Sequence, residues 1–133
     1  MPRVVVDTSV WVDYLNDRVD SEEVLKLDTL LANNADILIC PVVYQEVLQG
    51  IREEKAFAYV KSLLETLPML SPDFPVIEDT AVSLYRSLRK QGVTIRKSND
   101  CLIAAYALVY DVPVLFKDRD FDAMCAHSAV RRF

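Results

Sequence analysis

Short runs of apolar residues alternate along this chain with longer segments in which apolar residues recur every three or four positions. Three short runs are typical of strands buried on both faces, and they are 4–6 (VVV), 37–40 (ILIC) and 112–116 (VPVLF). Two weaker strand candidates are 74–78 (FPVIE) and the C-terminal AVRRF. The pattern predicts a short central sheet of about four to five strands.

The segments between these runs carry the period of helices with one apolar face. Ser21 and the glutamates after it predict a helix start, Pro41 suits a first helical position, and Gly92 predicts a helix stop. The predicted helices are SVWVDYLN, SEEVLKLDTLLANN, PVVYQEVLQGIR, EEKAFAYVKSLLETL, EDTAVSLYRSLRKQG, one within 93–110, and DRDFDAMCAHS. Strands that alternate with helices indicate a single α/β domain over 1–133, with a mainly parallel sheet flanked by helices on both faces.

One predicted helix is unusual, because no charged residue occurs from Cys101 to Tyr110. A helix that is apolar on every face is normally buried. Asp100 nevertheless stands at its entrance, directly after Ser98 and Asn99. Asp100 could cap this helix, or it could be held at the edge of the core for chemistry.

Acidic residues follow the predicted strands. Asp7 comes directly after VVV, and Asp118 and Asp120 follow VPVLFK. Ligands bind beyond the carboxyl ends of the strands in open parallel sheets, so these acids are expected at one rim. Glu46 lies on the flank of the apolar face of its helix and could reach inward along the core. Together with Asp100, acids from four separate elements are expected to converge.

Each acid also has an ordinary structural interpretation. Asp7 and Asp100 could cap helices or complement their dipoles, DRDF could be a turn that starts a helix, and Glu46 alone is typical of a solvated helix position. Convergence favours the functional interpretation, because clustered carboxylates repel one another unless a cation or a proton intervenes. A site of carboxylate oxygens alone suits Mg²⁺ or Mn²⁺.

The other reactive residues in the sequence limit the classes of reaction that the protein could catalyse. His127 is the only histidine, which excludes a metal-free ribonuclease with two histidines, and no GxSxG motif supports a serine hydrolase. Glycine-rich phosphate loops are absent from the sequence as well. The remaining interpretation is metal-dependent phosphoryl chemistry.

Composition places the protein in a broad class. The 133 residues are 52% apolar and 26% charged, as in a folded domain, and the net charge of −5 argues against passive binding of nucleic acid. The three cysteines are far apart and are expected to be buried thiols rather than disulfides or zinc ligands. No apolar run approaches the roughly 20 residues that span a bilayer, and MPRVVVD lacks the apolar region of a signal peptide. We therefore expect a cytoplasmic protein with no membrane partner.

Four segments resemble the PIN domain family, and in particular the VapC-type toxin ribonucleases of bacterial and archaeal toxin–antitoxin pairs. In family order they are VVVDTSVWVDYL, CPVVYQEVLQGIR, SNDCLIAAYAL and VLFKDRDFDAM. DTSVW and NDCLIAA together are the specific part of this resemblance, which covers essentially the whole chain.

The resemblance also implies roles for individual residues. The acidic metal positions that it implies are Asp7, Glu46, Asp100 and a fourth acid at Asp118 or Asp120. Asp118 is preferred because it lies closer to the end of the strand, and Ser9 matches a small hydroxyl residue that supports the site.

A function follows from the same resemblance. It implies cleavage of single-stranded RNA, often in tRNA or ribosomal RNA, by a water that Mg²⁺ or Mn²⁺ activates, leaving a 5′-phosphate and a 3′-hydroxyl. It also implies a homodimer and a VapB-type antitoxin whose C-terminal segment blocks the site.

A basic run leads up to Asp100. Its five members, which could form a track for the RNA backbone, are Arg86, Arg89, Lys90, Arg96 and Lys97. Further candidates at the rim are Arg52, Lys117 and Arg119. The alternative is a solvated helix face without a ligand.

Other functional classes fit the sequence less well. A receiver-like regulatory domain requires a phosphorylatable aspartate after a middle strand, whereas this chain has Pro41 after ILIC. A haloacid-dehalogenase-type phosphatase requires the motif DxDxT after its first strand, whereas this chain has DTSVW there. The stronger rival is a PIN fold that only binds RNA or a protein partner.

Overall fold

A short parallel sheet forms the centre of the molecule. The computed structural model describes residues 3–18 and 20–133, and its strands are β1 (Arg3–Val6), β2 (Asp36–Leu38) and β3 (Val114–Leu115). They run parallel in the order β2-β1-β3, with Val4 beside Ile37 and Val5 beside Val114. Val4, Val5 and Val6 are almost completely buried. The three strands predicted from apolar runs are confirmed, although each of the two edge strands is shorter than its run.

Single bridges extend the sheet at both edges. Ile39 bridges to Met69 beyond β2, and Val114 bridges to Arg132 beyond β3, both in parallel orientation. Backbone hydrogen bonds of 2.9–3.0 Å flank each bridge. About four to five strands were expected, whereas the described residues form a sheet of three strands that two bridged segments extend. The C-terminal AVRRF contributes one bridge rather than a strand.

The strand candidate at 74–78 is wrong, because its residues open helix α5 (Val76–Lys90). The buried residues of α5 follow helical spacing, and they are Ile77, Ala81, Leu84 and Leu88. Glu78 and Asp79 lie in the first turn, where acidic side chains suit the helix dipole. A five-residue apolar pattern does not distinguish a strand from the first turn of a helix. The helical spacing of the apolar residues that follow identifies this segment as a helix.

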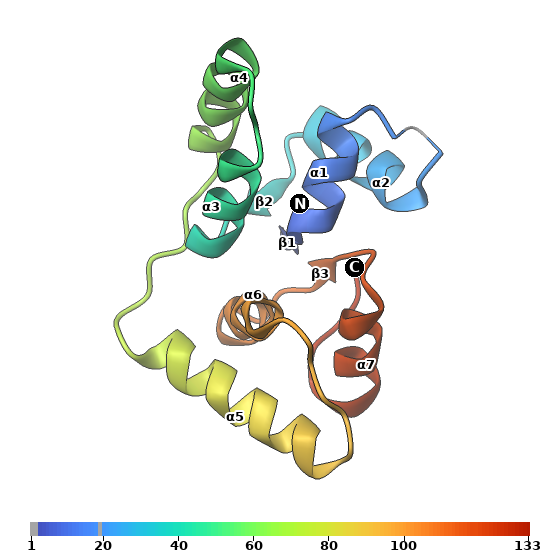
Figure 1. Cartoon of the computed structure of the whole chain (residues 1–133), viewed down its shortest axis with the longest axis vertical. Coiled ribbons are helices and arrows are strands. Elements are labelled where there is room, and N and C mark those ends of the chain that lie inside the picture. Colours follow the sequence, from blue (N-terminus) through green and yellow to red (C-terminus); the bar gives the residue numbers. More distant parts are fainter. Residues whose placement is uncertain (1–2, 19) are drawn as a thin grey trace.

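Helices cover both faces of the sheet, as predicted. Besides α5 they are α1 (Thr8–Leu15), α2 (Glu22–Ala32), α3 (Pro41–Gln49), α4 (Glu54–Glu65), α6 (Ser98–Val109) and α7 (Arg119–His127). Figure 1 shows α1 and α2 on one side of the sheet and α5 and α6 on the other. The predicted helix signals are confirmed: Ser21 accepts a hydrogen bond from the Val24 amide, and Pro41 opens α3. Gly92 follows α5 with a φ of +83°, which glycine adopts readily.

The uncharged helix α6 is buried, as its sequence predicted. It packs against β1 and α5, and its buried positions are Asp100, Cys101, Ile103, Ala104, Ala105, Tyr106 and Ala107. Cys40 and Cys101 are buried free thiols, as predicted, whereas the free thiol of Cys125 is only partly buried. Asp100 is thus a carboxylate held at the end of a core helix.

Within residues 3–18 and 20–133, no helix is both long enough and apolar enough to cross a membrane. The signal-peptide interpretation of the N-terminus depends partly on residues 1 and 2, which lie outside the described part of the chain.

Candidate metal centre

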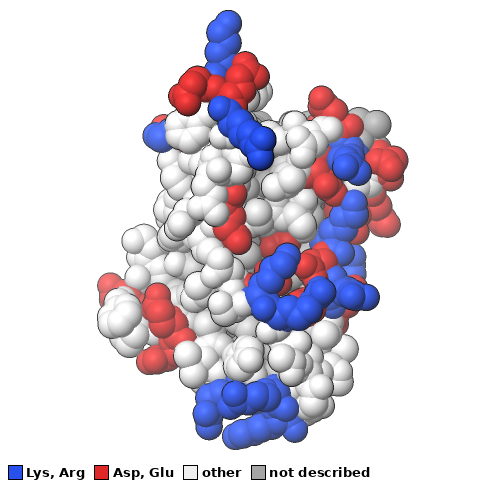
Figure 2. Space-filling view, in the orientation of Figure 1, with Lys and Arg blue, Asp and Glu red and all other residues white. Residues whose placement is uncertain are grey.

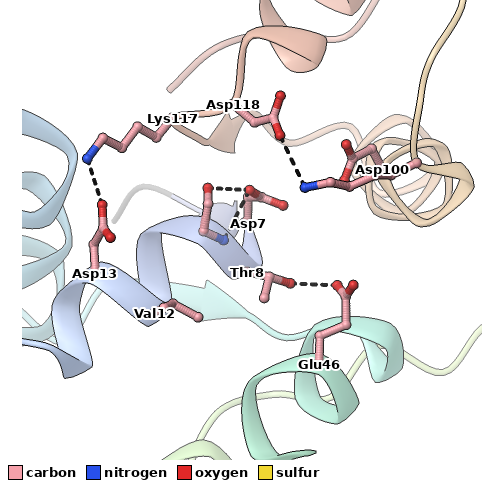
Figure 3. Close-up of a pocket in the computed structure, with 10 residues that line it drawn as sticks. Asp7, Thr8, Val12, Asp13, Glu46, Asp100, Lys117 and Asp118 are labelled. Carbon is pink, nitrogen blue, oxygen red and sulfur yellow. Dashed lines mark hydrogen bonds and ion pairs between the residues drawn. The ribbon is translucent and has the colours of Figure 1, made fainter. Parts of the chain in front are cut away.

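A cavity of about 430 Å³ lies beyond the carboxyl ends of β1 and β3. Four of its acids come from separate elements, and they are Asp7, Glu46, Asp100 and Asp118. Figure 3 shows their side chains arranged around this space, with Glu46 and Thr8 on one side and Asp100 and Asp118 on the other. The convergence of acids that the sequence predicted is therefore present in the structure.

Asp7 is both a helix cap and a wall of this cavity. It precedes α1, and its Oδ2 accepts hydrogen bonds from the Ser9 amide (3.2 Å) and the Ser9 hydroxyl (2.5 Å). Ser9 thus lies where a supporting residue was expected. Burial raises the pKa of Asp7, although the hydrogen bonds from Ser9 oppose this shift. The capping interpretation of Asp7 is correct, but it does not exclude a role in the cavity.

Asp100 does not cap α6. The residue at the N-cap position is Lys97, and Asp100 lies inside the first turn. Its Oδ2 is buried and has no hydrogen-bond partner among the described residues. Burial, and then the nearby carboxylates of Asp7 and Asp118, raise the pKa of Asp100 to about 7. A buried carboxylate oxygen without a donor is costly unless a cation or a proton compensates it.

Asp118 and Asp120 complete a tight group with Asp100. One carboxylate oxygen from each of the three lies within 4.8 Å of the others. Asp118 caps α7, because it accepts a 2.8 Å hydrogen bond from the Asp120 amide, and it lines the cavity. Asp120 accepts hydrogen bonds from the amide and Nε of Arg96, both at 3.4 Å. This geometry favours Asp118 as the fourth acid, with Asp120 beside it.

Glu46 reaches the cavity from α3 and is only partly exposed, as its place on the flank of the helix predicted. Thr8 Oγ1 donates to its Oε1 at 2.8 Å, and Asn99 Nδ2 donates to its Oε2 at 3.3 Å. Glu46 is outside the tight group of three acids, but it faces the same space. The two donors fix the orientation of its carboxylate.

Basic side chains surround the acidic hollow. Figure 2 shows lysines and arginines around it, and a separate basic group over the end of α5. Lys97 Nζ lies 3.6 Å from Asp118, and Arg96 Nε lies 3.4 Å from Asp120. The other basic residues of the predicted track, which lie on α5, are Arg86, Arg89 and Lys90. The sequence run is therefore divided into a pair at the cavity and a trio on a helix.

Sequence reasoning missed several residues that shape the site. Thr8 and Asn99 hold Glu46, and each directly adjoins a predicted acid in the sequence. Asp13 was not predicted either; it lines the cavity, and its Oδ2 lies 2.7 Å from Nζ of Lys117, the rim candidate that the sequence did identify. No local signal identifies this ion pair, because its members lie 104 positions apart.

The donor set fits a hard divalent cation. Every acidic group that lines the cavity offers carboxylate oxygens, the ligands that Mg²⁺ and Mn²⁺ prefer. The unpaired oxygen of Asp100 supplies a specific reason for a cation, since the basic side chains pair with Asp118 and Asp120 instead. The residues present therefore fit the metal that the sequence predicted.

A model of the PIN domain matches residues 4–126. The chain belongs to the PIN domain family. Two similar curated proteins are VapC ribonuclease Mb1587 of Mycobacterium bovis and ribonuclease VapC11 of Mycobacterium tuberculosis. Each is 32% identical to this PIN domain over 123 residues, which covers 91% of this chain and 90% of the relative.

Solved structures share the fold of this PIN domain. DNA-bound VapBC from Salmonella typhimurium matches with a TM-score of 0.75 and 16% identity, over 100% of this chain and 98% of the other. VapBC2 from Rickettsia felis, bound to a promoter DNA fragment, matches with a TM-score of 0.74 and 18% identity, over 98% of both chains. The α/β architecture is therefore that of a PIN domain, including its parallel sheet.

Proposed function

We propose that this PIN domain is a VapC-type endoribonuclease that hydrolyses phosphodiester bonds in single-stranded regions of RNA, such as those of tRNA or ribosomal RNA, with Mg²⁺ or Mn²⁺. The observation that carries the proposal is the buried, unpaired Oδ2 of Asp100, in a carboxylate grouped within 4.8 Å of Asp118 and Asp120. Similarity to VapC ribonucleases at 32% identity supports the choice of RNA as substrate.

The residues divide into two tasks in this proposal. Asp7, Glu46, Asp100 and Asp118 would hold the cation, with Asp120 next to them. A divalent cation there supplies positive charge to the phosphate and makes water more acidic. Lys97 and Lys117 also line the cavity and can neutralise phosphate oxygens. Thr8 and Asn99 keep the Glu46 carboxylate oriented.

The proposal also covers the protein's partners and its cellular location. Several structures with the same fold are described as VapBC or toxin–antitoxin complexes, which supports a VapB-type antitoxin as the partner that neutralises this protein. We also propose a homodimer and a cytoplasmic location, in keeping with the expectation from the sequence.

The test is a cleavage assay with purified protein, free of antitoxin, on single-stranded RNA. We expect cleavage with Mg²⁺ or Mn²⁺, none in EDTA, and products with 5′-phosphate ends. Asp100→Asn should lose at least about 100-fold in rate, since the loss of one charge-stabilising group commonly costs that much. Asp36→Asn, at an exposed position at the start of β2, is the control and should retain its rate. Full activity in EDTA would contradict the mechanism.

The rival is a PIN fold that binds RNA without cleaving it. Such a protein would retain RNA binding but show no cleavage with either metal. It would also show no heat on titration with Mn²⁺ if the acids held no cation.

A further inference from the structure

A second cavity of about 390 Å³ lies on the other side of Glu46, between α3 and α6. Its volume is near the lower end of the roughly 300–1,000 Å³ of small-molecule sites. We call it the amide pocket, because its walls carry the side-chain amides of Gln45, Gln49 and Asn99. Its polar groups differ from those of the metal centre, where carboxylates predominate.

Faces of two helices form most of the amide pocket, and Glu78 of α5 completes its lining. Gln45 and Gln49 are four residues apart on α3, and Asn99, Leu102 and Tyr106 are three and four residues apart on α6. Side chains at these spacings lie on one face of a helix. The two faces therefore confront one another across the pocket, and rigid elements set its width.

The amide pocket shares a wall with the metal centre. Glu46 lines both cavities. Thr8, in the metal centre, donates to one carboxylate oxygen of Glu46, and Asn99, in the amide pocket, donates to the other. A group bound in the amide pocket would therefore be separated from the metal centre by one side chain.

Several polar groups in the amide pocket are available to a ligand. Among the residues that the structure describes, no side-chain hydrogen bond involves Gln45, Gln49 or the Tyr106 hydroxyl. The two glutamines are exposed, whereas Tyr106 is nearly buried. Val42 and Leu102 add apolar surface. The pocket thus offers hydrogen-bond donors and acceptors beside a surface that can cover a flat ring.

The charge of the amide pocket limits its ligand. Within the described residues, its lining includes no lysine or arginine, while Glu46 and Glu78 contribute carboxylates. A phosphate group would be repelled there. An uncharged planar group with donors and acceptors on its edge fits better. Amide side chains read the edges of nucleobases in this way, and proteins that bind single-stranded RNA commonly cover the faces of unstacked bases.

We propose that the amide pocket binds the nucleobase next to the phosphate that occupies the metal centre, so that Gln45, Gln49 and Asn99 set the base preference of cleavage. This inference rests on the proposed function for its phosphate, but its base-binding part can be measured without cleavage. It predicts a preference for one base at a single position near the cut.

The cleavage test compares wild-type protein with a Gln45→Leu, Gln49→Leu double variant on RNA of random sequence. Sequencing of the 5′-phosphate ends gives the base preference at each position around the cut. A good edge contact gives roughly five- to hundredfold discrimination, so we expect the preference at one position to fall by about fivefold or more. Gln91→Leu, at the end of α5, is the matched control and should leave every preference unchanged. An unchanged preference in the double variant would overturn the proposal.

A binding test distinguishes failure of this inference from failure of the proposed function. The four uncharged ribonucleosides are titrated to millimolar concentration in EDTA, and the side-chain amide resonances of glutamine and asparagine are followed by NMR. We expect at least one nucleoside to shift the amides of Gln45, Gln49 and Asn99, but not that of Gln91. An inactive protein that shows these shifts would refute only the nuclease. Absence of the shifts would overturn the proposal that the pocket binds a base. Shifts that depend on protein concentration and not on nucleoside would also overturn it, because they indicate that a second copy of the protein covers the pocket.

Discussion

Asp100 is the residue on which the proposed metal centre depends most. Its carboxylate is buried, has an unpaired oxygen and adjoins the other acids. Each of these conditions destabilises the metal-free protein, and a divalent cation relieves all three. The stability of the protein should therefore report on this single side chain.

We predict that Asp100→Asn leaves the melting temperature of the metal-free protein unchanged or raises it, because the substitution removes a repelling charge at nearly constant volume. Added Mn²⁺ should stabilise the wild type by about 2.7 kcal/mol at 100 times its dissociation constant, but the variant much less. Thermal melts of both proteins with and without Mn²⁺ measure this. An equal Mn²⁺ shift in the two proteins would remove Asp100 from the metal centre.

The raised pKa of Asp100, about 7, predicts a pH dependence in EDTA. Folded protein binds a proton that the unfolded chain, with a pKa of about 3.9, has already released. The contribution of Asp100 to the free energy of unfolding is therefore greatest below about pH 4 and is lost as the pH rises toward 7. The raised pKa of Asp7 acts in the same direction. Urea unfolding between pH 4 and 7 should show a smaller decline in the free energy of unfolding for Asp100→Asn than for wild type. Asp36→Asn is the control and should keep the wild-type decline.

At the scale of elements, the basic run is the feature that the fold divides. Arg96 and Lys97 lie in the loop before α6 and pair with acids of the metal centre, whereas the remaining members lie on α5. Arg89 also packs against the ring of Tyr85, with its guanidinium carbon 5.6 Å from the ring centre. The two groups should therefore contribute differently to RNA binding.

We predict that a Lys97→Gln, Lys117→Gln double variant weakens RNA binding and reduces its salt dependence, because both lysines line the cavity. The slope of log affinity against log salt should fall by about 1.4, at about 0.7 per phosphate contact on a single strand. The Arg86→Gln, Arg89→Gln, Lys90→Gln triple variant should change the slope less. Fluorescence anisotropy in EDTA at several salt concentrations measures both. A larger effect of the triple variant would place the RNA track along α5.

At the scale of the whole molecule, the C-terminal segment joins parts of the chain that are far apart in sequence. Arg132 bridges to Val114 at the sheet edge, pairs with Asp122 at 2.7 Å and Glu23 at 3.5 Å, and lies 4.3 Å over the ring of Phe116. The backbone and side chain of one residue thus connect α2, α7 and the sheet edge.

We predict that Arg132→Ala lowers the free energy of unfolding by roughly 1–2 kcal/mol, through loss of the cation–π contact and two partly exposed ion pairs. The neighbouring Arg131 is the matched control, because it pairs only with the well-exposed Asp111 among the described residues. Arg131→Ala should cost less than about 0.5 kcal/mol. Urea denaturation measures both, and equal losses would show that Arg132 has no special role.

Much of this protein was predictable because apolar periodicity dictates burial locally. The three apolar runs form parallel strands, and acids that follow parallel strands must meet at one edge of the sheet. The same reasoning identified α6 as a core helix and placed Asp100 at its entrance. It failed at 74–78, where a short apolar pattern suits either a strand or the first turn of a helix.

The sequence by itself determined most of the elements, the core and four of the acids that meet. Only the tertiary structure decided which atoms touch: that Asp118 rather than Asp120 lines the cavity, that Thr8 and Asn99 hold Glu46 from two sides, and that the basic run separates. The physical reason is that periodicity specifies the face on which a side chain lies, whereas distances between side chains depend on how elements far apart in the chain pack together.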